Sequence, residues 1–242
     1  MGKRIMLVAG EASGDALGGP LMAALTEQSS EQPEFIGVGG SAMTAEGMAS
    51  LFPISDLSVM GLAEILPRLR LIFRRMKQTE TLARETRPDI IITIDSPGFN
   101  FRLGKRLKYL GIPLVHYVAP TVWAWKPGRA KKIAQFLDHL LVLLPFEPPY
   151  FEIEGLDCTF VGHSAVSHLP GDGPAFRDRH DISESAIVLG VLPGSRQGEV
   201  SRLLPEFLET AEQLNSEIDD LVVVVPAVDH VSAVIKQGFD GK

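Results

Sequence analysis

The chain has 242 residues, of which 45% are hydrophobic and 22% are charged, with a formal net charge of −7. This composition is ordinary for a globular protein with a sizeable core, and the negative charge argues against nonspecific binding to nucleic acid. The single cysteine, Cys158, excludes an intrachain disulfide and favours a reducing compartment. The first apolar run is too short for a signal peptide and no run is long enough to cross a bilayer, so we expect a soluble or surface-bound protein.

Short apolar runs alternate with helical patterns along the first two thirds of the chain, which predicts an α/β fold with a parallel sheet. The expected strands cover residues 3–9, 35–39, 90–94, 112–118, 139–144 and 159–161. After the first strand we expect a loop at residues 10–15, with two glycines, and then a helix over residues 16–28. The loop lacks the GxGxxG fingerprint, so it is either an anion-binding turn at a helix start or a plain capped turn.

Residues 57–84 form the longest helical pattern, with an apolar stripe and basic residues on either side of it. This combination predicts a helix that lies on an anionic membrane surface, or else a core-packing helix with a solvated basic face. Pro67 is expected to kink this helix or to start a new one.

The β-branched run Ile90–Ile94 predicts a strand that is buried on both faces, and it ends at Asp95. Pro97 and Gly98 stop the strand directly behind this acid. Because ligands of open α/β sheets bind beyond the carboxyl ends of the strands, Asp95 is a candidate site residue. The alternative is that Asp95 only caps a helix that begins near Asn100.

Residues 101–137 contain no acid and eight basic residues, which predicts a positive face for phosphate groups or anionic lipid. Trp123 and Trp125 lie within this segment at the end of an expected strand. They could line a sugar or lipid site, and packing in the core is the equally weighted alternative.

A connection rich in glycine and proline follows at residues 162–174, with His163 at its start. A second α/β unit then begins with a strand at residues 186–192, the loop 193–200, a helix to about residue 215 and a strand at residues 221–225. The Pro-Gly-Ser-Arg196 loop combines backbone donors, a helix start and a cation, which suits a diphosphate. We therefore expect domains at residues 1–165 and 166–242. Because two strands cannot form a doubly wound domain, we expect the second domain to be incomplete and the chain truncated.

A set of motifs in fixed order resembles the lipid-A-disaccharide synthase family. The motifs are Val8-Ala-Gly-Glu-Ala-Ser-Gly-Asp15, Val59-Met-Gly61, Ile94-Asp-Ser-Pro-Gly-Phe-Asn100, His116-Tyr-Val-Ala-Pro-Thr-Val-Trp-Ala-Trp125, Leu144-Pro-Phe-Glu147, Val161-Gly-His163 and Leu192-Pro-Gly-Ser-Arg196. The resemblance covers the chain to about Val228. It implies a GT-B-like fold, in which a Rossmann-like N-terminal domain with a parallel sheet is followed here by the beginning of a second Rossmann-like domain, with the two facing each other across a cleft.

The resemblance also implies roles for individual residues. Asp95 would be the catalytic base. The diphosphate of a nucleotide sugar would be bound by Gly194, Ser195, Arg196 and Glu199. The substrate-binding loops of the cleft would contain Gly10, Glu11, Ser13, Gly14, Asp15, Pro97, Asn100 and His163. For His163 the alternative is a hydrogen-bonded structural histidine, which is the more frequent case. A membrane-docking helix would present Leu62, Ile65, Leu66, Arg68, Leu69, Ile72, Phe73, Arg74, Arg75 and Met76. Gly98 departs from many relatives, which have an acid there, so this mechanism does not require that acid.

The implied activity is inverting sugar transfer in lipid A biosynthesis, a part of lipopolysaccharide metabolism in Gram-negative bacteria. The enzyme would transfer 2,3-diacylglucosamine from UDP-2,3-diacylglucosamine to 2,3-diacylglucosamine 1-phosphate (lipid X), releasing UDP. No metal or other cofactor is expected, nor a nucleic-acid partner. The expected location is cytoplasmic, on the inner face of the inner membrane. A homodimer of the full-length protein is one possible oligomeric state, and the sequence does not decide it. The alternatives are a UDP-sugar epimerase-like enzyme, which shares the architecture but does not need a membrane helix, and an inactive fragment that only binds acceptor or membrane.

Overall fold

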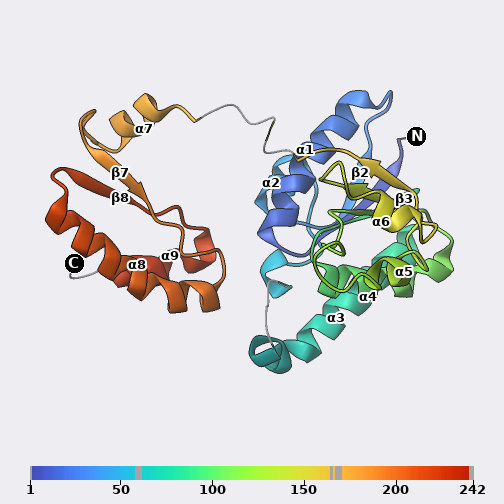
Figure 1. Cartoon of the computed structure of the whole chain (residues 1–242). Coiled ribbons are helices and arrows are strands. Elements are labelled where there is room, and N and C mark those ends of the chain that lie inside the picture. Colours follow the sequence, from blue (N-terminus) through green and yellow to red (C-terminus); the bar gives the residue numbers. More distant parts are fainter. Residues whose placement is uncertain (1, 58–61, 164–165, 167–170, 240–242) are drawn as a thin grey trace. The chain divides into compact units, whose positions relative to one another are not determined.

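The computed structural model describes residues 2–57, 62–163, 166 and 171–239, and for residues 62–67, 229 and 230 it describes the backbone alone. The chain divides into two compact units, Met1–His168 and Leu169–Lys242 (Figure 1).

The first unit contains a six-stranded parallel sheet with the strand order β2-β1-β3-β4-β5-β6. Its strands are β1 (Arg4–Ala9), β2 (Glu34–Val38), β3 (Ile90–Ile94), β4 (Leu114–Tyr117), β5 (His139–Val142) and β6 (Cys158–Phe160). The connecting helices are α1 (Ala12–Gln28), α2 (Ser41–Ala45), α3 (Leu62–Thr86), α4 (Pro97–Leu107), α5 (Arg129–Ile133) and α6 (Pro149–Glu152), with short 3₁₀ turns at Ile54–Asp56 and Lys108–Leu110. The expected α/β class and all six expected strands are confirmed.

Both faces of the sheet are covered, which explains why β1 and β3 are almost entirely apolar. On one face Met6 and Ile91 pack in a cluster with side chains of α3, α4, α5 and α6. On the other face Leu7 and Ile92 pack in a second cluster with α1 and α2. Figure 1 shows α1 and α2 on one side of the sheet and α3, α4 and α5 on the other.

Two helices begin earlier than the sequence indicated. Helix α1 begins at Ala12, so the expected loop at residues 10–15 is wrong for its last four residues. Helix α4 begins at Pro97 rather than near Asn100, because proline lacks only an N–H that is unpaired in a first helical turn and has a backbone angle suited to that position. Helix α3 is one element across Pro67, where a kink or a new helix was expected.

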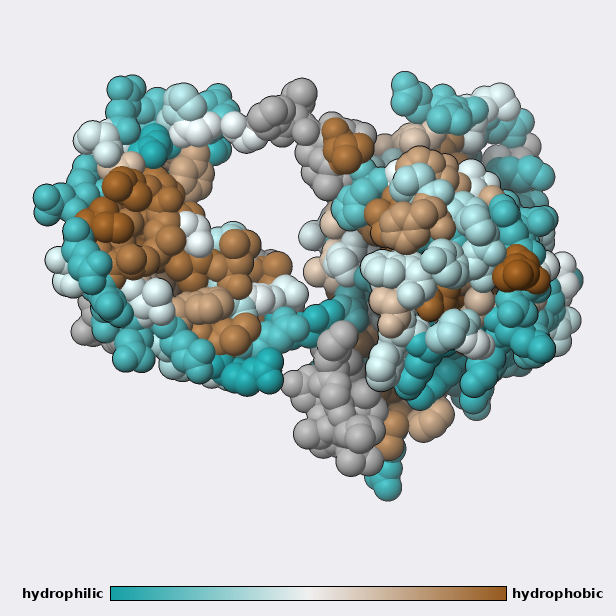
Figure 2. All heavy atoms as spheres, viewed as in Figure 1, coloured by the Kyte–Doolittle hydropathy of each residue, from teal (hydrophilic) through white to brown (hydrophobic). Residues whose placement is uncertain are grey.

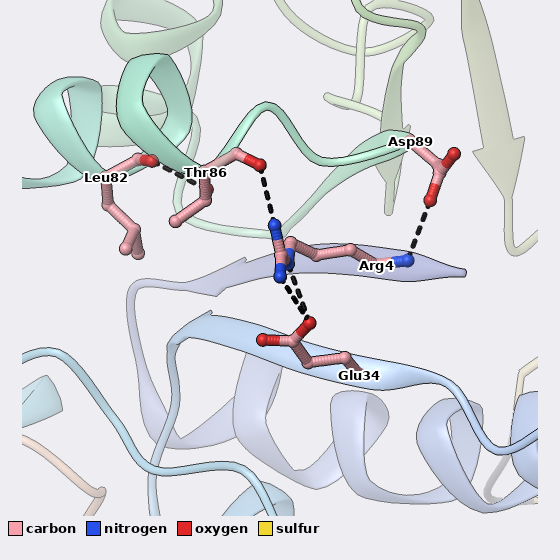
Figure 3. A network of polar contacts seen from close by, with 5 residues as sticks. All are labelled: Arg4, Glu34, Leu82, Thr86 and Asp89. Atoms are coloured by element: carbon pink, nitrogen blue, oxygen red, sulfur yellow. Dashed lines mark hydrogen bonds and ion pairs between the residues drawn. The ribbon is translucent and has the colours of Figure 1, made fainter. Parts of the chain in front are cut away.

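The amino edge of the sheet is held by Arg4 (Figure 3). Its guanidinium donates to Glu34 of β2 (Nε–Oε2 2.7 Å) and to the Thr86 carbonyl at the end of α3 (2.9 Å). Its backbone N–H donates to Asp89 (2.8 Å), and this hydrogen bond lowers the pKa of the Asp89 carboxyl. The network therefore ties β1, β2 and α3 together at the edge opposite the carboxyl ends of the strands.

The second unit is a single parallel βαβ unit with flanking helices. It consists of α7 (Gly173–Arg179), β7 (Ile187–Gly190), α8 (Gln197–Glu217), β8 (Leu221–Val224) and α9 (Asp229–Phe239). Val200, Leu204 and Leu208 of α8 pack against Val231 and Ile235 of α9. Figure 2 shows apolar residues gathered over β7 and β8, and Ile187 is 52% exposed.

A candidate active site at the carboxyl edge of the sheet

The order of the strands defines where a ligand would bind in the first unit. In the sheet β2 lies on one side of β1, and β3, β4, β5 and β6 follow in this order on the other side. The connections that follow β1 and β3 therefore diverge at this point, and open α/β sheets bind their ligands beyond the carboxyl ends of the strands at such a point. Asp95 follows β3 directly, and Gly10 and Ser13 follow β1.

Asp95 is held at this point by its backbone and by one side chain. Its N–H donates to the carbonyl of Tyr117 on β4 (2.9 Å), and the Ser13 hydroxyl donates to its carboxylate (Oγ–Oδ2 2.8 Å). Among the described residues no other side chain hydrogen-bonds this carboxylate, and Asp95 is half-buried. Asp95 and the next residue, Ser96, both have left-handed backbones, with φ of 51° and 45°. Such conformations cost on the order of 1–3 kcal/mol each and concentrate at functional sites.

Gly10 lets the two loops meet. A Cβ on Gly10 would lie 2.3 Å from the Ser96 Oγ and 2.4 Å from its Cβ, closer than atoms can approach. A side chain here would therefore displace the turn that presents Asp95. Gly14, one residue beyond Ser13 in the first turn of α1, is in a less crowded position, since its Cβ would make a tight contact of 3.1 Å with the Ile94 carbonyl of β3.

Asn100 is a structural part of the same turn. Its amide nitrogen donates to the carbonyls of Val8 (3.3 Å), Ile94 (3.1 Å) and Asp95 (2.8 Å), so it joins the ends of β1 and β3. The side chain is 1% exposed, and its Oδ1 has no partner among the residues that the structure describes. The structure thus places Asn100 beneath Asp95, holding its backbone.

The expected substrate residue Asp15 serves another element. Its buried carboxylate accepts from the backbone N–H groups of Gly40 (2.7 Å), Ala42 (2.9 Å) and Met43 (3.1 Å), at the start of α2. These are donors that a helix start leaves unpaired, and a carboxylate there also complements the helix dipole. Asp15 therefore caps α2, and its oxygens are engaged by that helix.

Two polar residues that the sequence analysis did not single out lie below the site. Thr93 of β3 and His116 of β4 are paired in the strand register and are both buried, with 2.8 Å between Thr93 Oγ1 and His116 Nδ1. Burial lowers the pKa of His116 from 6.5 to about 4, and the nearby Asp95 charge opposes this shift only in part. The ring is therefore neutral at physiological pH. The sequence signal that could have identified these two residues is a polar residue inside an otherwise apolar strand.

The remaining expected cleft residues of the first unit are Glu11, Pro97 and His163. Glu11 precedes α1 and is half-buried, and Pro97 begins α4. His163 is exposed and lines a groove of about 250 Å³ with Leu17 of α1, Tyr117 and other apolar side chains.

The Pro-Gly-Ser-Arg loop of the second unit lies between β7 and α8. Gly194 has φ of 115°, and a Cβ there would lie 2.8 Å from Glu199 Oε2. Arg196 directly precedes α8, and its guanidinium pairs with Glu199 (2.9 Å). The loop therefore places a fixed cation at the start of a 21-residue helix, where backbone N–H groups favour an anion.

Helix α3 divides its stripe between the core and the surface. Met76 is buried and Ile72 packs against the core, while Arg75 pairs with Asp56 (Nε–Oδ2 2.7 Å) and lies over the Phe52 ring. Phe73 is 57% exposed, and Arg68, Arg70 and Arg74 are exposed beside the half-buried Leu69. The expected residues Leu62, Ile65 and Leu66 have side chains outside the described part of the chain. The core-packing alternative thus holds for the second half of the stripe.

No described helix is both long enough and apolar enough to cross a membrane. In the described ranges no three histidine, cysteine or acidic side chains gather in a way that could hold a metal ion. Cys158 is half-buried, and burial raises the pKa of its thiol to about 12.

The fold of the chain is shared with solved structures that have Rossmann-like domains. The S. aureus MnaA–UDP co-structure superposes with a TM-score of 0.68 at 16% identity, over 99% of this chain and 67% of that chain. The UDP-GlcNAc 2-epimerase from Neisseria meningitidis bound to UDP-GlcNAc superposes with a TM-score of 0.67 at 10% identity, over 98% of this chain and 70% of that chain. These identities establish the fold alone, and the expected Rossmann-like GT-B class is confirmed.

The family model described as lipid-A-disaccharide synthetase matches residues 5–237. The lipid-A-disaccharide synthase of Rhodospirillum centenum is 56% identical over 237 residues, covering 96% of this chain and 59% of its own length. That of Paramagnetospirillum magneticum is 52% identical, covering 96% and 61%. The chain belongs to the lipid-A-disaccharide synthase family, and it spans about 60% of the length of these relatives.

Proposed function

We propose that the protein transfers 2,3-diacylglucosamine from UDP-2,3-diacylglucosamine to lipid X, with inversion at the anomeric carbon. The observation that supports this proposal most directly is the Asp95 carboxylate, which follows β3 on a turn with left-handed backbone angles and is hydrogen-bonded by Ser13. The choice of this reaction rests on the chain's membership of the lipid-A-disaccharide synthase family.

In this mechanism Asp95 accepts the proton from the acceptor's primary hydroxyl while that oxygen attacks the anomeric carbon. The bond from the anomeric carbon to the diphosphate breaks, and UDP leaves with the electron pair. The Ser13 hydrogen bond fixes the orientation of the carboxylate. Asn100 and the Gly10 contact hold the backbone beneath it. A base positioned in this way contributes roughly 10²–10⁴ in rate.

The second unit would bind the departing diphosphate. Gly194, Ser195 and Arg196 would supply backbone donors and a cation, and Glu199 would keep the guanidinium in place. We expect these groups to stabilise the charge that develops on UDP. The chemistry of this donor set needs no metal or cofactor, so the substrates are the only small molecules proposed.

The first unit would also attach the protein to the inner face of the inner membrane. Phe73 and the exposed arginines of α3 would contact the headgroup layer, at about 1 kcal/mol for each basic residue near an anionic surface. Flotation of the protein with anionic vesicles, and weaker flotation of a Phe73→Ser variant, would support this attachment.

A transfer assay with UDP-2,3-diacylglucosamine and lipid X tests the reaction. We expect the unchanged chain to form the disaccharide and Asp95→Asn to retain at most about 1% of the rate, while Asp89→Asn at the opposite edge stays near normal. Near-normal transfer by Asp95→Asn would remove Asp95 from the role of base. Absence of transfer by the unchanged chain would favour the inactive-fragment alternative, and conversion of UDP-GlcNAc without transfer would favour an epimerase.

A further inference from the structure

A cluster of exposed aromatic rings lies at the carboxyl edge of the sheet, beyond β4 and β5. Trp123 and Trp125 of the segment 119–128 are 44% and 64% exposed, and Phe146 and Leu144 of the turn 144–147 are 47% and 37% exposed. The Trp123 and Phe146 rings meet edge to face with centroids 5.4 Å apart, so the two connections form one surface. We call these four residues, with Lys126, the aromatic surface. Packing of the tryptophans in the core, one of the two expectations from sequence, is therefore wrong.

The turn that carries Phe146 has an inverted burial pattern. Its acid, Glu147, is 3% exposed, and Glu147 Oε2 accepts from the Leu144 N–H (2.9 Å) while the Glu147 N–H donates to the Leu144 carbonyl (3.2 Å). A buried carboxylate thus fixes a turn whose apolar side chains face solvent. Burying an acid and exposing a phenyl ring both oppose stability, so this arrangement indicates a binding surface.

The tryptophan segment is anchored in the same way. Val122 is 2% exposed and packs in the main core cluster, and the backbone N–H of Trp125 donates to the Thr121 carbonyl (3.0 Å). The backbone is therefore fixed by buried neighbours while both indole rings remain outside. A preformed display of large rings loses little conformational freedom when it binds.

The charge around the rings is basic. Lys126 Nζ lies 5.2 Å from the Trp125 ring centroid, and Arg129, Lys131 and Lys132 of α5 follow directly along the chain. Two other basic residues of the segment 101–137, Arg106 and Lys108, are paired with acids elsewhere. The adjoining groove of about 390 Å³, between residues 127–130 and α6, adds apolar lining from Tyr150 and Ile153 and one acid, Glu154.

We propose that the aromatic surface inserts into the headgroup layer of an anionic lipid bilayer, as a contact separate from α3. Tryptophan rings favour the boundary between headgroups and acyl chains, and the lysines and arginine beside them would bind lipid phosphates. The connections after β3, β4 and β5 share one edge of the sheet, so this contact brings the bilayer to the edge that presents Asp95. The inference concerns attachment and holds whatever reaction the protein catalyses.

The chain contains only two tryptophans, Trp123 and Trp125, so its tryptophan emission reports on this surface alone. The experiment mixes the unchanged chain with vesicles of phosphatidylglycerol and phosphatidylethanolamine that have brominated acyl chains. We expect a blue shift and quenching of at least half the emission, with little change on phosphatidylcholine vesicles of the same bromine content. Trp123→Phe and Trp125→Phe variants assign the quenching to each ring.

Variants measure the contribution of the surface to partitioning. We expect Lys126→Gln to lower the vesicle partition coefficient about fivefold and Trp125→Ser at least tenfold, while Trp125→Phe stays within about twofold. Lys3→Gln, at the amino edge, is the matched charge control and should bind normally. Circular dichroism confirms that each variant is folded.

Three results would overturn the proposal. One is flotation with anionic vesicles while both tryptophans stay unquenched, because α3 would then be the contact. Another is quenching by brominated phosphatidylcholine to the same extent. The third is a spectral response to monomeric dihexanoyl phosphatidylglycerol with none to vesicles, which would assign the surface to a single amphiphile. A failed sugar-transfer assay would leave all three readouts unaffected, so this inference and the proposed reaction fail separately.

Discussion

Acidification is expected to destabilise the first unit through one residue, His116. Its ring is fully buried between Thr93, whose hydroxyl lies 2.8 Å from Nδ1, and Phe101, whose ring centroid is 4.7 Å away. An unfolded chain takes up a proton at this ring near pH 6.5, whereas the folded chain does so only near pH 4. Because the unfolded state binds more protons in this window, stability falls as the pH is lowered through it.

The size of the effect follows from the two pKa values. Each pH unit between about 6.5 and 4 corresponds to about 1.4 kcal/mol, so His116 alone removes about 3 kcal/mol from the free energy of unfolding across the window. This is a large part of the 5–15 kcal/mol that is usual for a domain. Well above pH 6.5 the ring is neutral in both states, and its contribution to the pH dependence vanishes.

Urea unfolding at a series of pH values measures this effect. Tryptophan emission is the suitable probe, because both tryptophans lie in the first unit and the transition of that unit is then followed by itself. Between pH 6 and pH 4.5 the free energy of unfolding of His116→Gln should depend less steeply on pH than that of the unchanged chain, by about 1.4 kcal/mol per pH unit. His139→Gln on the adjacent strand is the matched control and should keep the steep dependence. Equal slopes for the unchanged chain and His116→Gln would refute the reasoning.

Three further substitutions test other parts of the two sites. Gly10→Ala should destabilise the first unit by about 1–3 kcal/mol in urea unfolding, because its Cβ would overlap the Ser96 side chain; a second change, Ser96→Gly, should restore most of the loss, and no rescue would argue against the clash. Asp15→Asn removes the charge from three N–H···O bonds at the start of α2 and should cost about 1–3 kcal/mol; an unchanged midpoint would contradict the capping role. Arg196→Gln should weaken UDP binding about 10- to 100-fold by calorimetry; Arg202→Gln, farther along α8, is its control, and equal UDP affinity in all three proteins would exclude Arg196 from the diphosphate site.

The sequence was sufficient for the order of elements in the first unit because its signals are local. Strands of a sheet covered on both faces are mostly apolar along their length, as Ile90–Ile94 shows, and such runs identified all six strands. Asp95 was predictable as a site residue for the same reason, since an acid at the end of a buried strand stands at the edge where ligands bind.

Contacts between distant parts of the chain decided the roles of neighbouring residues in one motif. Ser13 and Asp15 are two residues apart in α1, yet Ser13 bonds Asp95 while Asp15 caps α2. Residues two apart on a helix point in different directions, and which partner each one meets depends on how α2 and β3 pack around α1. Sequence alone therefore gave both the same expected role in a cleft loop.

The sequence by itself determined the α/β class, the strand order along the chain and the acid at the end of β3, because hydrophobic periodicity and turn residues act over a few positions. The tertiary structure decided which polar groups are used up in holding the fold and which stay available. Asn100 is engaged with three carbonyls, His116 is buried and neutral, and the two tryptophans face solvent. Burial and hydrogen bonding depend on neighbours that packing brings together from distant positions, and local residue patterns do not specify them.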